Sequence, residues 1–284
     1  MYDRPLNVRK INYGAPNAPF DFTRSLRETG FSVLNNHPID KCLIDTVYDE
    51  WKDFFNSNHK KKYLYNEKNQ DGFFPFETEN AKGHTLKDLK EFYHIYPWGR
   101  YPSEISQSTK TLYEQLLELT STLLSWIQNQ TPKSISTRFS MPLHEMIKGS
   151  RTNLLRIIHY PPLNGKEQHG AIRGAAHEDI NLITVLVAGT KPGLQVKDTN
   201  GLWHDVSCDP GCLAINTGDM LQEVSGGYYP STTHQVINPG DGIDNASRYS
   251  MPLFLHPEDS VRLSKKYTAR QYLDERLREI GLKG

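Results

Sequence analysis

The second half of the chain consists of short runs of β-forming residues separated by proline, glycine, asparagine and aspartate, and this pattern constrains the fold most. The runs are TNLLRIIHYPP, NLITVLVAG, GLQVKD, LWHDV, CLAINTGD, THQVINP and RYSMPLFLHP. Runs of this length at even spacing, with turn residues between them, are typical of an antiparallel sandwich or barrel. We therefore predict a β-rich body over residues 151–257.

Helical periodicity flanks this body on both sides. Apolar residues recur at helical spacing in IDKCLIDTVYDEWKDFFNS and again from about residue 105 to 129, and MPLHEMIKG predicts a shorter helix. Residues 56–100 show little periodicity and predict a long irregular loop, of which residues 71–80 could cover a site. Thr268 and Gln271 form a candidate capping box for a closing helix that ends at Gly281.

The predicted fold class is therefore α+β, in a single domain over residues 1–284. Residues 1–150 form its mainly helical part, residues 151–257 its β core, and residues 258–284 its C-terminal helix.

Composition narrows the range of partners. The chain has 33 basic and 33 acidic residues, so net charge gives no reason to expect a nucleic acid or an anionic membrane as partner. No apolar run is long enough to span a bilayer, and the N-terminus lacks a signal-peptide core. Three cysteines, Cys42, Cys208 and Cys212, fit a reducing compartment, and we expect a cytoplasmic protein. The sequence does not set the oligomeric state and allows a monomer.

The segment AAHEDINLIT places His177 and Asp179 two residues apart before an apolar run. On a strand, side chains at this spacing leave the same face, with Cα atoms roughly 6.6 Å apart. His234 follows 55 residues after Asp179, at the start of another predicted strand. Two imidazoles and one carboxylate leave coordination positions open, which suits non-haem Fe(II). Zinc with open positions is an alternative that ligand type does not exclude.

A candidate carboxylate receptor follows the second histidine. Arg248 lies fourteen residues past His234, and Ser250 would share its face of a strand. A guanidinium beside a hydroxyl can bind a carboxylate in bidentate fashion. Arg173, in the segment QHGAIRG, could bind an acidic substrate or belong to a solvated loop.

Other polar residues of the predicted strands are candidates for positions at the mouth or edge of the barrel. Arg156 and Thr184 could point into the mouth of the barrel. Asn216 and Asp219, in NTGD, are assigned to a turn at the edge of the barrel.

These segments resemble a known family. HEDINLITVLVAG, GLQV, NTGDML, STTHQV and RYSMPLFLHP are similar to the isopenicillin N synthase-like family of Fe(II)/2-oxoglutarate-dependent oxygenases. The segments ETGFSVLNNHPI, KDLKEFYHI, HYPP and TARQYLDERL extend the resemblance over nearly the whole chain in the family's order. The resemblance implies a double-stranded β-helix, or jelly-roll, core with iron at one mouth.

The resemblance also implies roles for individual residues. The iron ligands would be His177, Asp179 and His234, and the distal carboxylate of 2-oxoglutarate would be held by Arg248, Ser250 and Tyr160. Dioxygen and 2-oxoglutarate would be consumed, with succinate and CO2 as products, to oxidise an unactivated C–H bond of a small molecule. Hydroxylation is the default outcome, and desaturation or cyclisation would use the same oxidant.

The sequence departs from the family at positions that do not touch the metal ligands. Gln235 replaces the usual arginine after the second histidine, Ile158 and His159 replace the Asn-Tyr before Tyr160, and QEVSGG replaces a Gln-x-Trp-Thr-Asn run. Two other functions are therefore open at this stage. One is an iron oxidase of the same fold that ignores 2-oxoglutarate and uses the Arg-x-Ser pair for a substrate carboxylate. The other is a non-catalytic metal-binding barrel.

Overall fold

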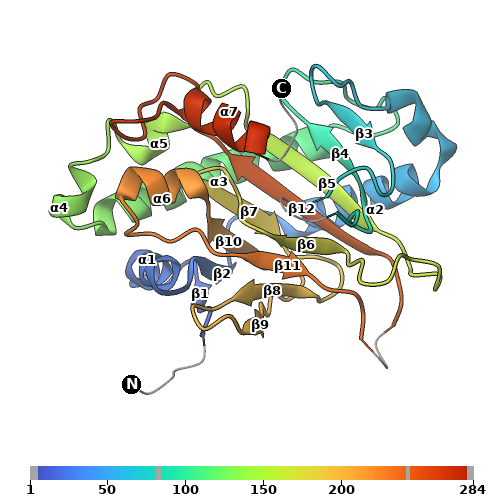
Figure 1. Cartoon of the computed structure of the whole chain (residues 1–284), viewed down its shortest axis with the longest axis horizontal. Coiled ribbons are helices and arrows are strands. Elements are labelled where there is room, and N and C mark those ends of the chain that lie inside the picture. The colour runs from blue at the N-terminus through green and yellow to red at the C-terminus, as the bar shows by residue number, and fades with distance from the viewer. Residues whose placement is uncertain (1–5, 81–84, 241–243, 280–284) are drawn as a thin grey trace.

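The computed structural model describes residues 6–80, 85–240 and 244–279. Two β-sheets face each other, and helices pack on the outer side of the larger sheet (Figure 1). The helices are α1 (Ala18–Thr29), α2 (Lys41–Asn56), the 3-10 helix η1 (Asn58–Tyr63), α3 (Ser108–Gln130), α4 (Lys133–Ser136), α5 (Leu143–Met146), α6 (Asp219–Ser225) and α7 (Ala269–Glu279).

The strands form a jelly-roll core. The eight-stranded sheet has the order β1 (Lys10–Asn12), β2 (Phe31–Asn35), β10 (Leu213–Thr217), β7 (Ile183–Val187), β12 (Arg248–Leu255), β5 (Leu154–Tyr160), β4 (Glu91–Ile95) and β3 (Gly72–Phe74). The four-stranded sheet has the order β6 (Gly174–His177), β11 (His234–Val236), β8 (Leu194–Lys197) and β9 (Trp203–Asp205). From β5 to β12 the chain passes back and forth between the two sheets, which confirms the predicted fold class.

Successive side chains along a strand point to opposite faces of the sheet, and this divides the core into two clusters, one on each face of the larger sheet. On β5, Ile157 points to the outer side and packs with buried helix residues such as Trp51 of α2. Its neighbour Ile158 points inward and packs with Val196 and Val236 of the smaller sheet. Each fully buried side chain of this size contributes about 1.5–3 kcal/mol. The inner face of the larger sheet is thus the wall on which a site enclosed by the barrel can be built.

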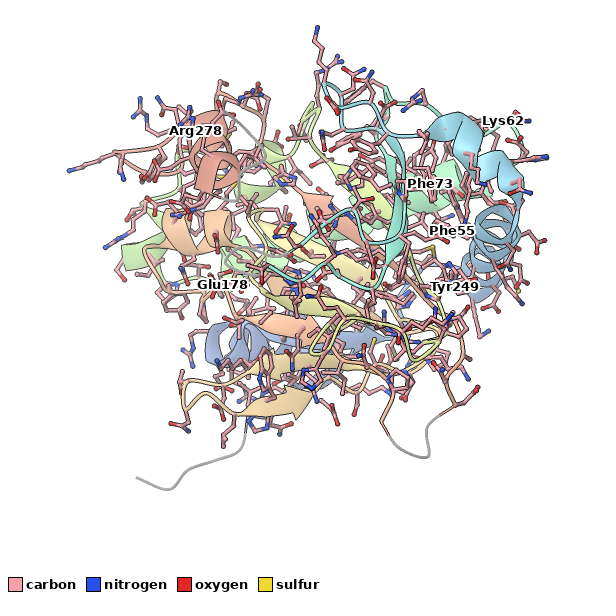
Figure 2. The ribbon with its side chains drawn as sticks, turned by 45° about the vertical axis from the view of Figure 1, so that its right-hand side comes forward. Phe55, Lys62, Phe73, Glu178, Tyr249 and Arg278 are labelled. Carbon is pink, nitrogen blue, oxygen red and sulfur yellow. The ribbon has the colours of Figure 1, made fainter. Side chains whose placement is uncertain are left out.

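The N-terminal part shares this core. Helix α1 ends at Gly30, whose φ of 71° requires a residue that tolerates the left-handed region, and β2 begins at the next residue. An aromatic cluster then joins α2 to the larger sheet (Figure 2). The ring centroid of Phe55 lies 6.3 Å from that of Phe73 and 6.3 Å from that of Tyr249.

Two predicted elements differ from the structure. Residues 56–100 are not one irregular loop, because they contain η1, β3 and β4, and β4 pairs with β5. All five residues of β4 are buried, so no alternation of polar and apolar residues marks it in the sequence. The helix predicted from MPLHEMIKG is only the four residues of α5.

The closing helix α7 begins as predicted. The Gln271 side chain accepts the amide of Thr268 at 2.9 Å, and the Thr268 hydroxyl accepts the amide of Gln271 at 3.3 Å. This is the expected capping box. The predicted end at Gly281 lies outside the described residues. Across the described ranges, none of the helices is both long enough and apolar enough to cross a membrane.

Candidate metal centre and cosubstrate pocket

The pairing of β6 with β11 places two histidines opposite each other. His177 is the last residue of β6, His234 is the first of β11, and the two are register partners with ring centroids 4.4 Å apart. Their Nε2 atoms lie 3.8 and 3.9 Å from Oδ1 of Asp179. The three donor atoms all lie within 4.8 Å of one another, so a single ion could contact all three.

Backbone carbonyls set the tautomer of both rings. Nδ1 of His177 lies 2.8 Å from the carbonyl oxygen of Ala175, and Nδ1 of His234 lies 3.1 Å from that of Thr232. A carbonyl oxygen can only accept, so each Nδ1 carries the proton and donates it. Each Nε2 therefore keeps its lone pair and directs it toward Asp179, which is the arrangement of metal-binding histidines.

Asp179 lies in the turn after β6, so the expectation that it shares a strand face with His177 is wrong. Its position is fixed by hydrogen bonds instead. The amide of Asp219 donates to the Asp179 carbonyl at 2.7 Å. The Oδ2 atom accepts from the Thr184 hydroxyl at 2.5 Å and from the Asn216 amide at 2.7 Å. Both lone-pair directions of Oδ2 are thereby used, and Oδ1 is left to face the imidazoles.

Thr184 and Asn216 are register partners on β7 and β10, which explains why their side chains meet at one oxygen. Thr184 thus lies inside the barrel, as expected. The turn-and-edge role predicted for Asn216 is incomplete, because its amide also holds the carboxylate. The sequence feature that could have indicated this role is the position of Asn216 in an apolar, buried strand, where a polar side chain needs a hydrogen-bond partner.

The charge states of the cluster favour metal binding near neutral pH. Burial, together with the neighbouring His234 ring, lowers the pKa of His177 to about 4. Burial would raise the pKa of Asp179, but the two imidazoles and the hydrogen bonds from Asn216 and Thr184 hold that pKa below its usual value. A neutral imidazole and an ionised carboxylate are the forms that bind a metal.

A buried basic group lies on the inner face of the larger sheet. Arg248 begins β12 and pairs with Tyr160, the last residue of β5; its guanidinium carbon lies 5.0 Å from the Tyr160 ring centroid. Its Nε donates to the Lys191 carbonyl at 3.0 Å, while Nη1 is buried without a hydrogen-bond partner. Ser250 is buried two residues further along the same face. The structure therefore brings together the three residues of the predicted carboxylate receptor.

Gly189 makes room for this guanidinium. A Cβ atom at Gly189 would lie 2.7 Å from Nη2 of Arg248 and 2.9 Å from its Cζ, closer than such atoms approach. Its φ is not in the left-handed region, so a larger residue at this position would displace the Arg248 guanidinium without straining the backbone.

The same inner face continues past the metal cluster. Phe254 of β12 pairs with Thr184, and the guanidinium carbon of Arg156 lies 5.6 Å from the Phe254 ring centroid and 4.4 Å from that of Phe92. The guanidinium forms two hydrogen bonds, of 3.0 and 3.2 Å, with the carboxylate of Glu79. Arg156 therefore lies on the inner face of the larger sheet, and its charge is already neutralised by the chain itself.

Asp88 joins two other charged residues, Glu79 and Lys90, to the strand that carries His177. Asp88 accepts the amide of Ala175 at 3.0 Å, and the Lys90 ammonium binds both Asp88 at 2.7 Å and Glu79 at 2.8 Å. None of these three charged residues was assigned a role from the sequence. Asp88 and Lys90 lie in KDLKE, whose alternating charge is ordinarily found on solvated surfaces.

Arg173 is also inside the protein. It is only 2% exposed, so the solvated-loop alternative for this residue is wrong. Glu178, between His177 and Asp179, is exposed and accepts the Thr233 hydroxyl at 2.8 Å, so its carboxylate is held beside the turn (Figure 2).

Comparison with known proteins agrees with the predicted family. A family model described as the 2OG-Fe(II) oxygenase superfamily matches residues 151–257, and one described as non-haem dioxygenase in morphine synthesis N-terminal matches residues 21–115. Among curated proteins, gibberellin 2-beta-dioxygenase 4 of Arabidopsis thaliana is 24% identical over 274 residues, which are 90% of this chain and 80% of that protein.

Solved structures resemble the chain over almost its full length. A structure described as an oxygenase from Shewanella oneidensis is 53% identical with a TM-score of 0.88, covering 97% of this chain and 99% of that one. A structure described as a 2OG-Fe(II) oxygenase family protein from Caulobacter crescentus is 30% identical with a TM-score of 0.77, covering 96% and 99%. The chain therefore belongs to the 2OG-Fe(II) oxygenase superfamily and is a non-haem Fe(II)- and 2-oxoglutarate-dependent dioxygenase.

Proposed function

We propose that this dioxygenase oxidises an unactivated C–H bond of a small molecule, with hydroxylation as the default outcome. His177, Asp179 and His234 would hold the Fe(II), and Arg248, Ser250 and Tyr160 would hold the distal carboxylate of 2-oxoglutarate. The observation that carries the proposal is the convergence of two Nε2 atoms and one carboxylate oxygen, all within 4.8 Å of one another. Two nitrogen ligands and one oxygen ligand with open positions suit Fe(II) that must also bind a chelator and dioxygen.

The residues of the chain prepare the site before anything binds. The Ala175 and Thr232 carbonyls orient the two imidazoles, and Thr184 and Asn216 orient the carboxylate. Holding ligands in this way raises metal affinity, because less conformational freedom is lost on binding. When bound, the iron with 2-oxoglutarate and dioxygen supplies the oxidising chemistry, and the protein supplies position and exclusion of water.

The unpartnered Nη1 of Arg248 fits the carboxylate that we assign to it. A buried guanidinium nitrogen without a hydrogen bond is costly, and a carboxylate would satisfy it in bidentate geometry. Ser250 would donate a hydroxyl from the same face of β12.

The mouth favours a substrate with little net charge. Arg156 and Lys90 are both paired with Glu79, so neither cation is free to attract an anion. The rings of Phe92 and Phe254 flank the guanidinium and supply apolar walls. We also propose a cytoplasmic location, since Cys42, Cys208 and Cys212 are all free thiols.

The test is to add Fe(II) and then 2-oxoglutarate to the protein without oxygen and to record the visible metal-to-ligand charge-transfer band. The band should form with the native protein, disappear in His177→Ala, and need more 2-oxoglutarate in Arg248→Met. His169→Ala, at an exposed histidine of the neighbouring loop, is the matched control and should behave as the native protein. Iron binding without any band would overturn the assignment of 2-oxoglutarate to this pocket.

Succinate release can then be used to screen small molecules. Product mass distinguishes the outcomes, because hydroxylation adds one oxygen atom whereas desaturation or cyclisation removes two hydrogens. A protein that binds iron and 2-oxoglutarate but never couples succinate release to oxidation of any added compound would contradict the proposed C–H oxidation.

A further inference from the structure

Arg173 links the two sheets beside Arg248. It directly precedes β6 of the smaller sheet, where its backbone amide donates to the Asn238 side chain at 3.1 Å. Its Nη2 donates to the carbonyl of Ala246 at 2.9 Å. Ala246 lies two residues before Arg248, so the guanidinium of Arg173 lies beside the start of β12 in the larger sheet.

Both arginines are buried and incompletely satisfied. Each is 2% exposed, and each leaves one guanidinium nitrogen without a hydrogen-bond partner, Nε in Arg173 and Nη1 in Arg248. In the ranges that the structure describes, neither guanidinium forms an ion pair with an acidic side chain. The other basic groups of the barrel, Arg156 and Lys90, are each paired with Glu79, so this lack of a partner sets Arg173 and Arg248 apart.

Two buried positive charges without an acid are unfavourable. Burial, followed by the charge of Arg248, lowers the pKa of Arg173, which shows that the two cations repel each other. Removing an unpaired charge from water costs several kcal/mol, and a second like charge adds to this cost. An anion that binds between the two guanidinium groups would offset this cost.

We infer that Arg173 and Arg248 together bind the distal carboxylate of 2-oxoglutarate, and that Arg173 thereby selects dicarboxylic over monocarboxylic 2-oxo acids. This inference rests on the proposed function, which places that carboxylate at Arg248. A carboxylate held by two guanidinium groups from opposite sheets can only sit at one depth in the barrel. Chain length of the 2-oxo acid is then selected as well as charge, because the 2-oxo end must reach the metal.

The experiment measures binding of two ligands that differ in one group. Calorimetric titrations without oxygen would compare 2-oxoglutarate with 2-oxopentanoate, which has the same number of carbons and lacks the distal carboxylate. The protein would be loaded with Co(II), and Arg173→Met and Arg173→Lys would be compared with the native protein. Arg278→Met, at an exposed arginine of α7, is the matched control.

We expect Arg173→Met to bind 2-oxoglutarate roughly 10- to 100-fold more weakly, the usual effect of removing one charged hydrogen-bonding partner. Binding of 2-oxopentanoate should change less than about 3-fold, because that ligand has no carboxylate for Arg173 to contact. Arg173→Lys should recover part of the loss, since the ammonium keeps the charge but not the planar fork. Equal weakening of both ligands would overturn the inference in favour of a structural role, and no weakening of either would overturn it too.

Failure of this inference is distinguishable from failure of the proposed function. If Arg248→Met loses the preference for 2-oxoglutarate and Arg173→Met keeps it, only the role of Arg173 is wrong. If native protein does not prefer 2-oxoglutarate over 2-oxopentanoate, the proposed carboxylate site itself is wrong. Urea unfolding of the ligand-free proteins adds an independent readout. Arg173→Met should unfold at the same urea concentration as native protein or a higher one, whereas a structural arginine would give a lower midpoint.

Discussion

Replacing Thr184 by valine removes one of the two hydrogen bonds that orient the metal-facing carboxylate. Valine has nearly the same shape as threonine, and the site is only 2% exposed, so the change deletes a hydroxyl without opening a cavity. Oδ2 of Asp179 would keep the Asn216 amide at 2.7 Å and lose the hydroxyl at 2.5 Å. The carboxylate would then be held by one side-chain hydrogen bond instead of two, and Oδ1 would be held less firmly toward the imidazoles.

The size of the effect follows from the kind of bond removed. A hydrogen bond to a charged group contributes about 1.5–3 kcal/mol, and removing a partner of a metal-binding carboxylate typically costs 10- to 100-fold in metal affinity. We therefore expect Thr184→Val to bind Co(II) roughly 10- to 100-fold more weakly by calorimetry. Affinity of the preformed metal complex for 2-oxoglutarate should stay within about 3-fold, because the hydroxyl contacts Asp179 and not the pocket of Arg248.

A matched variant separates the hydroxyl from the methyl group. Thr184→Ser keeps the hydroxyl and should bind Co(II) within about 3-fold of native protein. The Asn181 amide donates to the Thr184 hydroxyl at 2.9 Å, so Thr184→Val should also lower the free energy of unfolding by about 1–3 kcal/mol. If Thr184→Val binds Co(II) as tightly as native protein, or if the serine variant loses as much affinity, the carboxylate is not oriented by this hydroxyl and the reasoning is refuted.

The other predictions concern the arginine pocket, the buried histidine of β4 and the metal. Gly189→Ala should weaken 2-oxoglutarate binding at least about tenfold by calorimetry and leave Co(II) affinity unchanged, because the added Cβ would displace Arg248. Gly14→Ala, where a Cβ would meet no such contact, is the control. Unchanged 2-oxoglutarate binding by Gly189→Ala would contradict the prediction. Burial and the charge of Arg156 lower the pKa of His94 well below 6.5, and its Nε2 accepts from Arg156 at 2.8 Å. The unfolded chain then binds more protons below pH 6.5, so the free energy of unfolding should fall by up to about 1.4 kcal/mol per pH unit as the pH drops from 6.5 to 5. Urea titrations should give a shallower slope for His94→Gln, and equal slopes would contradict the neutral buried state. Co(II) at 100 times its dissociation constant should raise the free energy of unfolding by about 2.7 kcal/mol, and a chelator should remove the gain; an unchanged urea midpoint would contradict a metal site formed in the folded state.

The convergence of His177, Asp179 and His234 could be predicted from sequence because their residue types and spacing are rare together. Histidine and aspartate at 177 and 179, with His234 at a strand start, needed no knowledge of the turn that carries Asp179. The predicted placement of both residues on one strand face was nevertheless wrong. β6 ends at His177, and nothing in the residue pattern shows that the strand stops before Asp179. Asn216 shows the limit of such reasoning, since its role depends on pairing with Thr184 across two strands far apart in sequence.

The parts that could not be predicted are those where long-range pairing decides the structure. β4 is buried on both faces, so its sequence shows no alternation, and its place beside β5 follows only from the assembled sheet. The ion-pair cluster of Glu79, Lys90 and Arg156 could not be predicted for the same reason. Glu79 lies in a loop, Lys90 directly precedes β4 and Arg156 lies on β5, so the three residues meet only in the folded protein.

We propose that the distribution of charge inside the barrel separates the binding site of the 2-oxo acid from that of the substrate. Near the mouth, the cations Arg156 and Lys90 are neutralised by Glu79 and Asp88, so this region offers hydrogen bonds and aromatic surface without net attraction for an anion. At the start of β12, Arg173 and Arg248 have no acidic partner among the described residues, so that region attracts a carboxylate strongly. Under our proposals, an anionic 2-oxo acid binds at the two arginines, and the mouth stays available for a substrate of low charge. Specificity follows from where the chain pairs its own charges and where it leaves them for a ligand.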